Sequence, residues 1–343
     1  MQEIQIVSLT AGLVAVIISF LITPVVIKIT WFFGLVDDPK KNPHPKVIHT
    51  RPIPRGGGLV IFAAILIATV LYLPLDKYLI SILLGAAFIT IYGLADDKWN
   101  LNPYLRLALQ FVAAGIPIAA GVGIAFVSNP FGGIINLSAL TSAIFALFWI
   151  VILMNFLNMG AKGVPGQLPG VTAIAAVTIA ILSLKFSADI TQWPVIVLAS
   201  ITAGAFLGFL PWNFHPQKIM PSFSGSNLAG YFLGVLSILA TTKVGLLTIV
   251  LGVPIIDTGY TVIRRVVSGK SPVWGDRLHL HHRLLDIGWS QKRVAVFYWL
   301  VTLILGLLAF NLNTQTKLYT IIGIALFVGG LILWLTYLTK RKS

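Results

Sequence analysis

The sequence predicts an all-α membrane protein whose chain crosses the bilayer ten or eleven times. Hydrophobic residues make up 57% of the 343 residues and charged residues only 10%, whereas soluble domains average about 25% charged residues. A chain of this length cannot bury so much apolar surface by folding on itself, so lipid must cover the remainder. Apolar runs close to the length of a membrane-spanning helix, roughly 20 residues, recur along the whole sequence.

The first apolar run, residues 4–27, is too long for the core of a signal peptide and lacks a small-residue cleavage site, so it predicts a retained span. Polar residues, glycines and prolines delimit the others. These further spans are residues 57–73, 78–94, 104–127, 137–153, 171–184, 193–210, 227–241, 244–262, 294–310 and 318–338. A continuous helix through Lys243 would reduce the count from eleven to ten. We expect a single transmembrane domain over residues 1–343.

Basic residues predict the orientation, because cytoplasmic loops are enriched in Lys and Arg. With the N-terminus outside and the C-terminus inside, nearly all of the 24 basic residues fall in inner loops; the exceptions are Lys77, Lys185, Lys243 and Lys317. The six histidines lie on the same side. Loops near an anionic leaflet and an anionic substrate then explain the net charge of +14. We therefore expect cytoplasmic loops to form the active-site face, and no nucleic-acid partner.

An acidic pair, Asp96 and Asp97, directly follows the third predicted span. A carboxylate at this position is costly unless it is paired or binds a cation. Adjacent acids suit Mg²⁺, which prefers oxygen ligands and shares its coordination shell with phosphates. An ordinary helix end, in which Lys98 pairs with one of the acids, is the alternative.

A late inner loop carries three histidines within four residues, His279, His281 and His282, flanked by Arg277 and Arg283. Such a cluster can bind a diphosphate or a metal ion, or act as an acid near pH 7. A basic loop lying on the membrane is the alternative. Because the chain has no cysteine, thiolate metal sites and cysteine nucleophiles are excluded.

Other inner loops carry groups that suit an anionic or polar ligand. Arg55 precedes three glycines, whose size allows close backbone approach. Amides and lysines follow in two further loops, and an acid lies within a later apolar run. These residues are Asn155, Asn158, Lys162, Asn213, Lys218 and Asp257. The loop that contains Asn155, Asn158 and Lys162 is equally compatible with a flexible connector. Asp257 could simply pair with Arg264.

The order of these motifs resembles that of the polyprenyl-phosphate N-acetylhexosamine-1-phosphate transferases, which are glycosyltransferases of family 4. The motifs are R-x-G-G at Arg55, the pair Asp96-Asp97, N-x-x-N at Asn155, N-F-x-P-x-K at Asn213, a Gly/Ser helix start at Gly225, Asp257 and H-x-H-H at His279. The superfamily includes the phospho-N-acetylmuramoyl-pentapeptide transferases and the UDP-GlcNAc:undecaprenyl-phosphate GlcNAc-1-phosphate transferases. The segment GKSPVWGDRLHLHHRLL is most similar to the second group.

The resemblance implies an enzyme in the plasma membrane of a prokaryote that takes part in cell-envelope glycan synthesis. Such an enzyme transfers a sugar 1-phosphate, typically N-acetylhexosamine 1-phosphate, from a UDP-sugar to a polyprenyl phosphate. The products are a polyprenyl-diphosphate-sugar and UMP, and the family's reaction depends on Mg²⁺. The oligomeric state is not implied, and a homodimer remains open.

The resemblance also implies roles for individual residues. Asp96 and Asp97 match acids that deprotonate the lipid phosphate or stand near the metal, and Asp97 and Asn158 are the candidate Mg²⁺ ligands. The three histidines match a catalytic motif that contacts the sugar diphosphate. The remaining residues are expected to bind substrate: Arg55, Asn155, Asn158, Lys162, Asn213, Lys218, Asp257 and Arg277.

Three acids of the family's pattern are replaced in this chain. Lys162 and Pro165 stand where the family has D-G-x-D-G, and Phe223 stands where an aspartate that binds Mg²⁺ is expected. Lys162 could instead meet the donor phosphates directly. A divergent transferase is the leading interpretation, and a catalytically silent relative that binds polyprenyl phosphate is the first alternative. A lipid or solute transporter is the second, although its polar groups would tend to lie near the bilayer midplane.

The predicted orientation can be tested on this cysteine-free chain with single cysteines. In intact cells, Asn102→Cys and Gln217→Cys should be shielded from a membrane-impermeant thiol reagent, and Asn129→Cys should be labelled, because the first two lie in predicted inner loops. All three should react after the membrane is permeabilised. Labelling of Gln217→Cys from outside would contradict the orientation.

Overall fold

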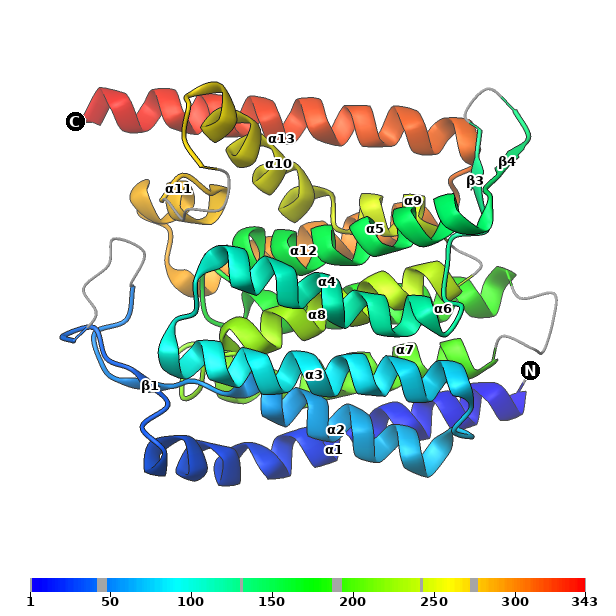
Figure 1. The fold of residues 1–343 in the computed structure, drawn as a ribbon. Coiled ribbons are helices and arrows are strands. Elements are labelled where there is room, and N and C mark those ends of the chain that lie inside the picture. The colour runs from blue at the N-terminus through cyan, green and yellow to red at the C-terminus, as the bar shows by residue number, and fades with distance from the viewer. Residues whose placement is uncertain are drawn as a thin grey trace.

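The computed structural model describes residues 2–41, 48–129, 132–186, 193–240, 243–271 and 277–342. This part of the chain is an all-α bundle (Figure 1), as the sequence predicts. The helices are α1 (Gln2–Phe32), α2 (Gly57–Tyr72), α3 (Lys77–Trp99), α4 (Pro103–Ala119), α5 (Ala139–Gly160), α6 (Gln167–Phe186), α7 (Trp193–Asn213), α8 (Ser222–Leu239), α9 (Lys243–Val250), α10 (Gly252–Val267), α11 (Leu280–Asp286), α12 (Gln291–Ala309) and α13 (Thr314–Lys342). The N- and C-termini lie at opposite ends of the bundle.

Eight of the described helices are long and apolar enough to cross a membrane. The shorter apolar helices α2 and α4 and the consecutive pair α9 and α10 account for the other predicted spans. The predicted break at Lys243 is confirmed, since α9 begins there. Two expectations were wrong in detail. The fourth span ends at Ala119 instead of residue 127, because glycines at 121 and 123 disfavour further helix.

The second correction concerns the predicted span 244–262, which is not one straight helix. It is broken at Leu251, and α9 and α10 are inclined by 86° to each other. Pro254 lies in the first turn of α10, where its missing N–H costs no hydrogen bond, and it could not have continued α9. The bend directs α10 toward the end of the bundle where the chain terminates, and α10 packs there against α5 and α13 (Figure 1).

Helix α8 lies in the middle of the bundle and is the most enclosed of the described spans (Figure 1). Every residue from Ser222 to Ser237 is buried. Its polar side chains therefore need partners inside the protein. The amide of Asn227 accepts a 2.5 Å hydrogen bond from Gln110 of α4, and Ser237 accepts one of 2.9 Å from Trp149 of α5. These bonds fix α8 against its neighbours and set the position of its first turn.

Two loops at one end of the bundle are joined by backbone hydrogen bonds beside that first turn. Strands β1 (Val36–Asp37) and β2 (Ile53–Pro54) pair antiparallel. Met220 donates to the carbonyl of Pro54 at 2.9 Å, and Gly57 donates to the carbonyl of Met220 at 3.0 Å. A Cβ atom on Gly58 would lie 2.4 Å from Ser224 Oγ. The glycines after Arg55 thus allow the close approach that the sequence predicts. A second hairpin, β3 (Phe126–Ser128) with β4 (Ile134–Asn136), lies at the opposite end of the bundle (Figure 1).

Candidate active site

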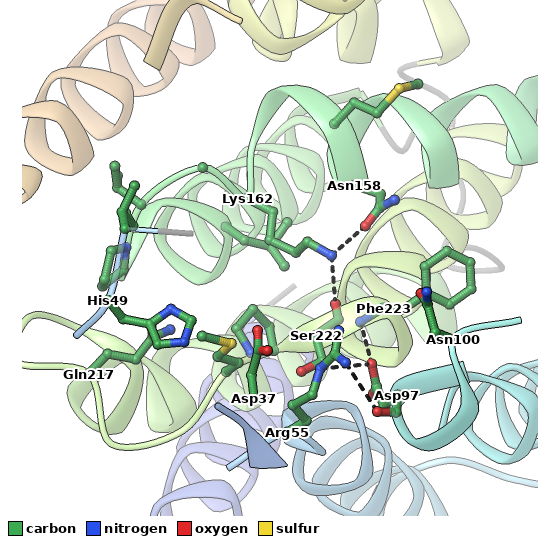
Figure 2. A pocket seen from close by; sticks show the side chains of 18 of the residues that line it. Asp37, His49, Arg55, Asp97, Asn100, Asn158, Lys162, Gln217, Ser222 and Phe223 are labelled. Atoms are coloured by element: carbon green, nitrogen blue, oxygen red, sulfur yellow. Dashed lines mark hydrogen bonds and ion pairs between the residues drawn. The ribbon is translucent and has the colours of Figure 1, made fainter. Parts of the chain in front are cut away.

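A cleft of about 1,040 Å³ opens at the end of the bundle where the loops predicted to be cytoplasmic meet, and Figure 2 shows part of its lining. It brings together residues that are far apart in the sequence, from β1 to the histidine loop. Five basic residues and two carboxylates line it: Lys41, Arg55, Lys98, Arg106 and Lys162 with Asp37 and Asp97. The cleft is therefore electropositive, which suits an anionic ligand.

Asp97 lies at the end of α3 and holds the start of α8. Its carboxylate accepts a hydrogen bond of 3.0 Å from the Phe223 backbone N–H (Figure 2) and another of 3.0 Å from the Ser224 hydroxyl. These groups belong to the first turn of α8, where a carboxylate also interacts favourably with the helix dipole. Arg55 lies beside the same carboxylate, with Nε 3.9 Å from Oδ1, and donates to the Asp97 carbonyl at 3.1 Å. The Asp97 side chain is fully buried.

Asp96 points to a different partner, because successive side chains on a helix diverge by about 100°. Its Oδ1 lies 2.5 Å from Nε of Arg106 and accepts from the Leu101 N–H at 3.0 Å. Arg106 also donates to Asn100 at 2.6 Å, and its guanidinium lies over the Phe223 ring, 5.1 Å from the centroid. The alternative in which Lys98 pairs with the acids is wrong. The ammonium of Lys98 lies instead over the Trp99 ring.

Lys162 follows α5 and reaches toward the start of α8. Its ammonium donates to Asn158 Oδ1 at 2.5 Å and to the Ser222 carbonyl at 3.3 Å (Figure 2). Burial lowers the pKa of Lys162 from 10.5 to about 8, against the opposing effect of the Asp97 carboxylate. Lys162 is therefore mostly protonated at neutral pH and becomes neutral under mildly alkaline conditions.

Amide side chains connect the loops around the cleft. Asn155 donates to Gln110 at 2.8 Å, and Gln110 donates to Asn227 of α8. Asn213 accepts from the Gly166 N–H at 2.8 Å and donates to the Ile219 carbonyl at 2.9 Å. Asn155, Asn158 and Asn213 all line the cleft, as predicted. The chain's own hydrogen bonds hold Asn155 and Asn213 in place.

All three histidines line the cleft, and a buried acid orients the first. Asp257 Oδ2 lies 3.0 Å from His279 Nδ1, while its Oδ1 accepts from the Leu280 N–H at 2.8 Å. A carboxylate at Nδ1 favours a proton on that nitrogen and leaves Nε2 for another partner. The alternative partner of Asp257, Arg264, is therefore not the one observed. The His281 ring stacks on His279 at 5.5 Å between centroids, and a Cβ atom on Gly163 would lie 1.9 Å from His281.

Three predicted substrate-binding residues, Lys218, Asp257 and Arg277, are not brought into the cleft lining. Lys218 is exposed, and its ammonium lies 4.9 Å from the centroid of the Trp212 ring. Arg277 pairs with Asp286 at 2.9 Å, and both side chains are well exposed. Of the predicted catalytic residues, Asp96 lies outside the lining, as Asp257 does. They act on it through Arg106 and His279.

Several residues of the site were missed in the sequence. Arg106 and Gln110 lie one turn apart on α4, so both face the same neighbours. The signal was two polar side chains at helical spacing within an otherwise apolar run. His49 and Gln217 also line the cleft. Nothing in the sequence singles them out, because the fold alone brings their loops together.

The described residues do not fit a Mg²⁺ site. They contain no group of three or more His, Asp or Glu side chains that could hold a metal ion. The candidate ligand Asn158 turns its Oδ1 to the Lys162 ammonium, and the Ser226 hydroxyl lies 2.8 Å from the same atom. The other candidate, Asp97, accepts hydrogen bonds from the start of α8 on both oxygens. Protein cations thus take the place in which a carboxylate-rich Mg²⁺ site is expected.

Comparison with known proteins identifies relatives over most of the chain. The sequence pattern of glycosyl transferase family 4 matches residues 79–241. A decaprenyl-phosphate N-acetylglucosaminephosphotransferase of Mycolicibacterium smegmatis is 32% identical over 332 residues, which cover 88% of this chain and 80% of that protein. A probable undecaprenyl-phosphate N-acetylglucosaminyl 1-phosphate transferase of Bacillus subtilis is 30% identical, with 89% and 85% covered. A phospho-N-acetylmuramoyl-pentapeptide-transferase of Caldanaerobacter subterraneus is also 30% identical, with 73% and 81% covered.

The position of Asp97 predicts a large loss of stability on truncation. Asp97→Ala should lower the free energy of unfolding by about 3 kcal/mol, because it leaves the first turn of α8 and Arg55 without their buried partner. The exposed pair of Arg277 and Asp286 provides the control, and Asp286→Ala should cost less than about 1 kcal/mol. Thermal melting of the purified proteins in one detergent measures both. Equal melting temperatures for Asp97→Ala and wild type would contradict the structural role.

Proposed function

This chain belongs to glycosyl transferase family 4, and we propose on that premise that its cleft transfers a sugar 1-phosphate to a polyprenyl phosphate. The protein is a multi-pass membrane enzyme, a phosphoglycosyl transferase that acts on a polyprenyl phosphate. The single observation that carries the assignment to this cleft is the convergence of the family's motifs. Asp97, Asn158 and His279 come from three distant segments and meet around one electropositive cavity.

The donor we propose is a UDP-sugar, with N-acetylglucosamine 1-phosphate as the transferred group. Two of the relatives compared above carry N-acetylglucosamine in their names and align with most of this chain. We further propose that the cleft faces the cytoplasm of a bacterial cell. This orientation follows from the concentration of basic residues at that end of the bundle and agrees with a cytoplasmic nucleotide donor.

The reaction has a simple balance. An oxygen of the lipid phosphate attacks the β-phosphorus of the donor and forms a new P–O bond. The bond from the β-phosphorus to the bridging oxygen breaks, and UMP leaves with that oxygen. A phosphate monoester has a second pKa near 6, so at neutral pH the lipid phosphate is largely dianionic and needs no general base. Asp96 pairs with Arg106, and Asp97 accepts a hydrogen bond from the Phe223 N–H, which is compatible with a reaction that needs no general base.

The chain's own residues mainly position the substrates and offset their charge, which is what phosphoryl transfer requires. Arg55 and Lys162 lie on either side of the first turn of α8 and present cations to the cleft. Asp257 holds His279 at Nδ1, and the doubly protonated ring would donate its Nε2–H to a phosphate oxygen. Asp96 fixes Arg106. Asp96, Asp97 and Asp257 thus act by holding the groups that line the cleft.

Radiolabelled transfer tests the proposal. The purified enzyme should convert UDP-[14C]GlcNAc and undecaprenyl phosphate into a labelled lipid and release UMP. His279→Ala should lower kcat/KM at least about tenfold, because it removes one hydrogen bond from the imidazole ring to the diphosphate. Lys185→Ala, at the opposite end of the bundle, is the control. The proposal fails if no labelled lipid forms from UDP-GlcNAc or from a panel of other UDP-sugars.

The lowered pKa of Lys162 predicts an alkaline limit to catalysis. In the free enzyme, kcat/KM should fall as the pH rises through about 8, because the ammonium that faces the donor phosphates loses its charge. Lys162→Arg should keep a lower but pH-independent activity in this range, since a guanidinium does not titrate there. Rates measured from pH 6.5 to 9.5 decide the matter. An identical alkaline limb in both proteins would show that another group is responsible.

A further inference from the structure

We propose that this cleft binds the donor diphosphate without a divalent cation, with the Lys162 ammonium, supported by Arg55, in the place of the metal. The inference rests on the proposed function for the identity of the donor. It starts from the disagreement between the family's Mg²⁺-dependent pattern and the side chains that meet here. Lys162, Pro165 and Phe223 replace three expected acids. In the structure, Lys162 and Phe223 each have partners of their own.

The position expected to supply a metal-binding aspartate is filled by an aromatic ring with its own partners. Phe223 is 5% exposed, and its ring packs edge-on against Tyr92 with 6.2 Å between centroids. The guanidinium of Arg106 covers the ring. Phe223 therefore gives a cation–π contact in place of an anionic oxygen. The Arg106 guanidinium therefore lies beside the position at which the family's pattern would place an anionic ligand for a metal ion.

Lys162 is held in a fixed position between two helices. Asn158 lies in the last turns of α5 and Ser222 is the first residue of α8, and both present an oxygen to the ammonium. An ammonium has three N–H donors, and two have partners here. The third remains for an oxygen of a ligand in the cleft that Lys162 lines. Fixed donors of this kind stabilise phosphate charge without reorganising during the reaction.

Charge balance favours the same conclusion. Asp97 is the carboxylate nearest to Lys162, and Arg55 already pairs with it. Asp96 is paired with Arg106. A divalent cation added to these groups would meet net positive surroundings, whereas a diphosphate would meet complementary charge. The fixed cations therefore suit a ligand that brings its own negative charge and no metal.

Binding of UDP to the purified protein tests the inference independently of turnover. Isothermal titration should give the same dissociation constant, within about twofold, in EDTA and in 5 mM Mg²⁺. Lys162→Met should weaken UDP binding at least about tenfold in both buffers, the loss expected for one charge-assisted hydrogen bond. Lys162→Arg keeps the charge and should lose less. Lys292→Met removes an exposed lysine at the same end of the molecule, outside the cleft lining, and should bind UDP like wild type.

The outcomes separate this inference from the proposed function. If the wild-type protein binds UDP only in the presence of Mg²⁺, the inference is overturned. It is also overturned if the Lys162→Met protein folds and binds UDP as tightly as wild type. Metal-independent, Lys162-dependent UDP binding with no transfer to undecaprenyl phosphate would support the inference and contradict the proposed reaction. Transfer that proceeds in EDTA supports both. Transfer that stops in EDTA and returns with Mg²⁺, together with UDP binding that requires Mg²⁺, supports the reaction and overturns the inference.

Discussion

The contact of the Asp97 carboxylate with the first turn of α8 is the interaction on which the rest of the site depends. It ties the end of α3 to the most enclosed helix of the bundle. The same aspartate holds Arg55, whose loop is joined to the segment before α8 by backbone hydrogen bonds. Since the first turn of α8 also supplies the Ser222 carbonyl to Lys162, a shift of this turn would move Arg55 and Lys162 together.

The second constraint is charge. A buried carboxylate needs a partner, and in this cleft the partners are cations of the chain itself. Asp96 holds Arg106, Asp97 holds Arg55, and Asp257 holds His279. Each acid thus fixes one of the groups that face the cavity. The hydrogen bonds of the Lys162 ammonium go to two neutral oxygens, so its charge remains available to a ligand.

The sequence alone predicts much of the fold because lipid imposes a strong and local requirement on composition. Long apolar runs indicate helices, and each predicted span contains a helix in the described structure, although the fourth ends early at Ala119. The 86° bend at Leu251 was missed, because a proline in the first turn of a new helix and one inside a kinked span look alike in an apolar run. The direction in which the chain turns depends on packing that no local pattern encodes.

The residues of the site can also be divided into those that the sequence predicts and those that it does not. Motif residues such as Asn158 and His279 were predicted correctly to gather in one place, since they are rare polar groups at one membrane boundary. Their partners could not be assigned, because Asp257 lies 22 residues from His279 and Gln110 lies 45 residues from Asn155. Lys218 belongs to a predicted motif and yet turns to a tryptophan outside the lining.

The pairing of each acid explains how the chain can lose three family aspartates and keep an ordered cleft. A site built from several carboxylates is repulsive until a cation arrives, so its empty form stores unfavourable energy. Replacing one acid by Lys162 and another by Phe223 removes that repulsion and leaves Asp97 free to hold α8. Both positions meet at the first turn of this helix, where the backbone N–H of residue 223 donates to Asp97 and the neighbouring Ser222 carbonyl accepts from Lys162. Restoring a single aspartate would therefore place a carboxylate beside one already in use, without rebuilding a metal site around it.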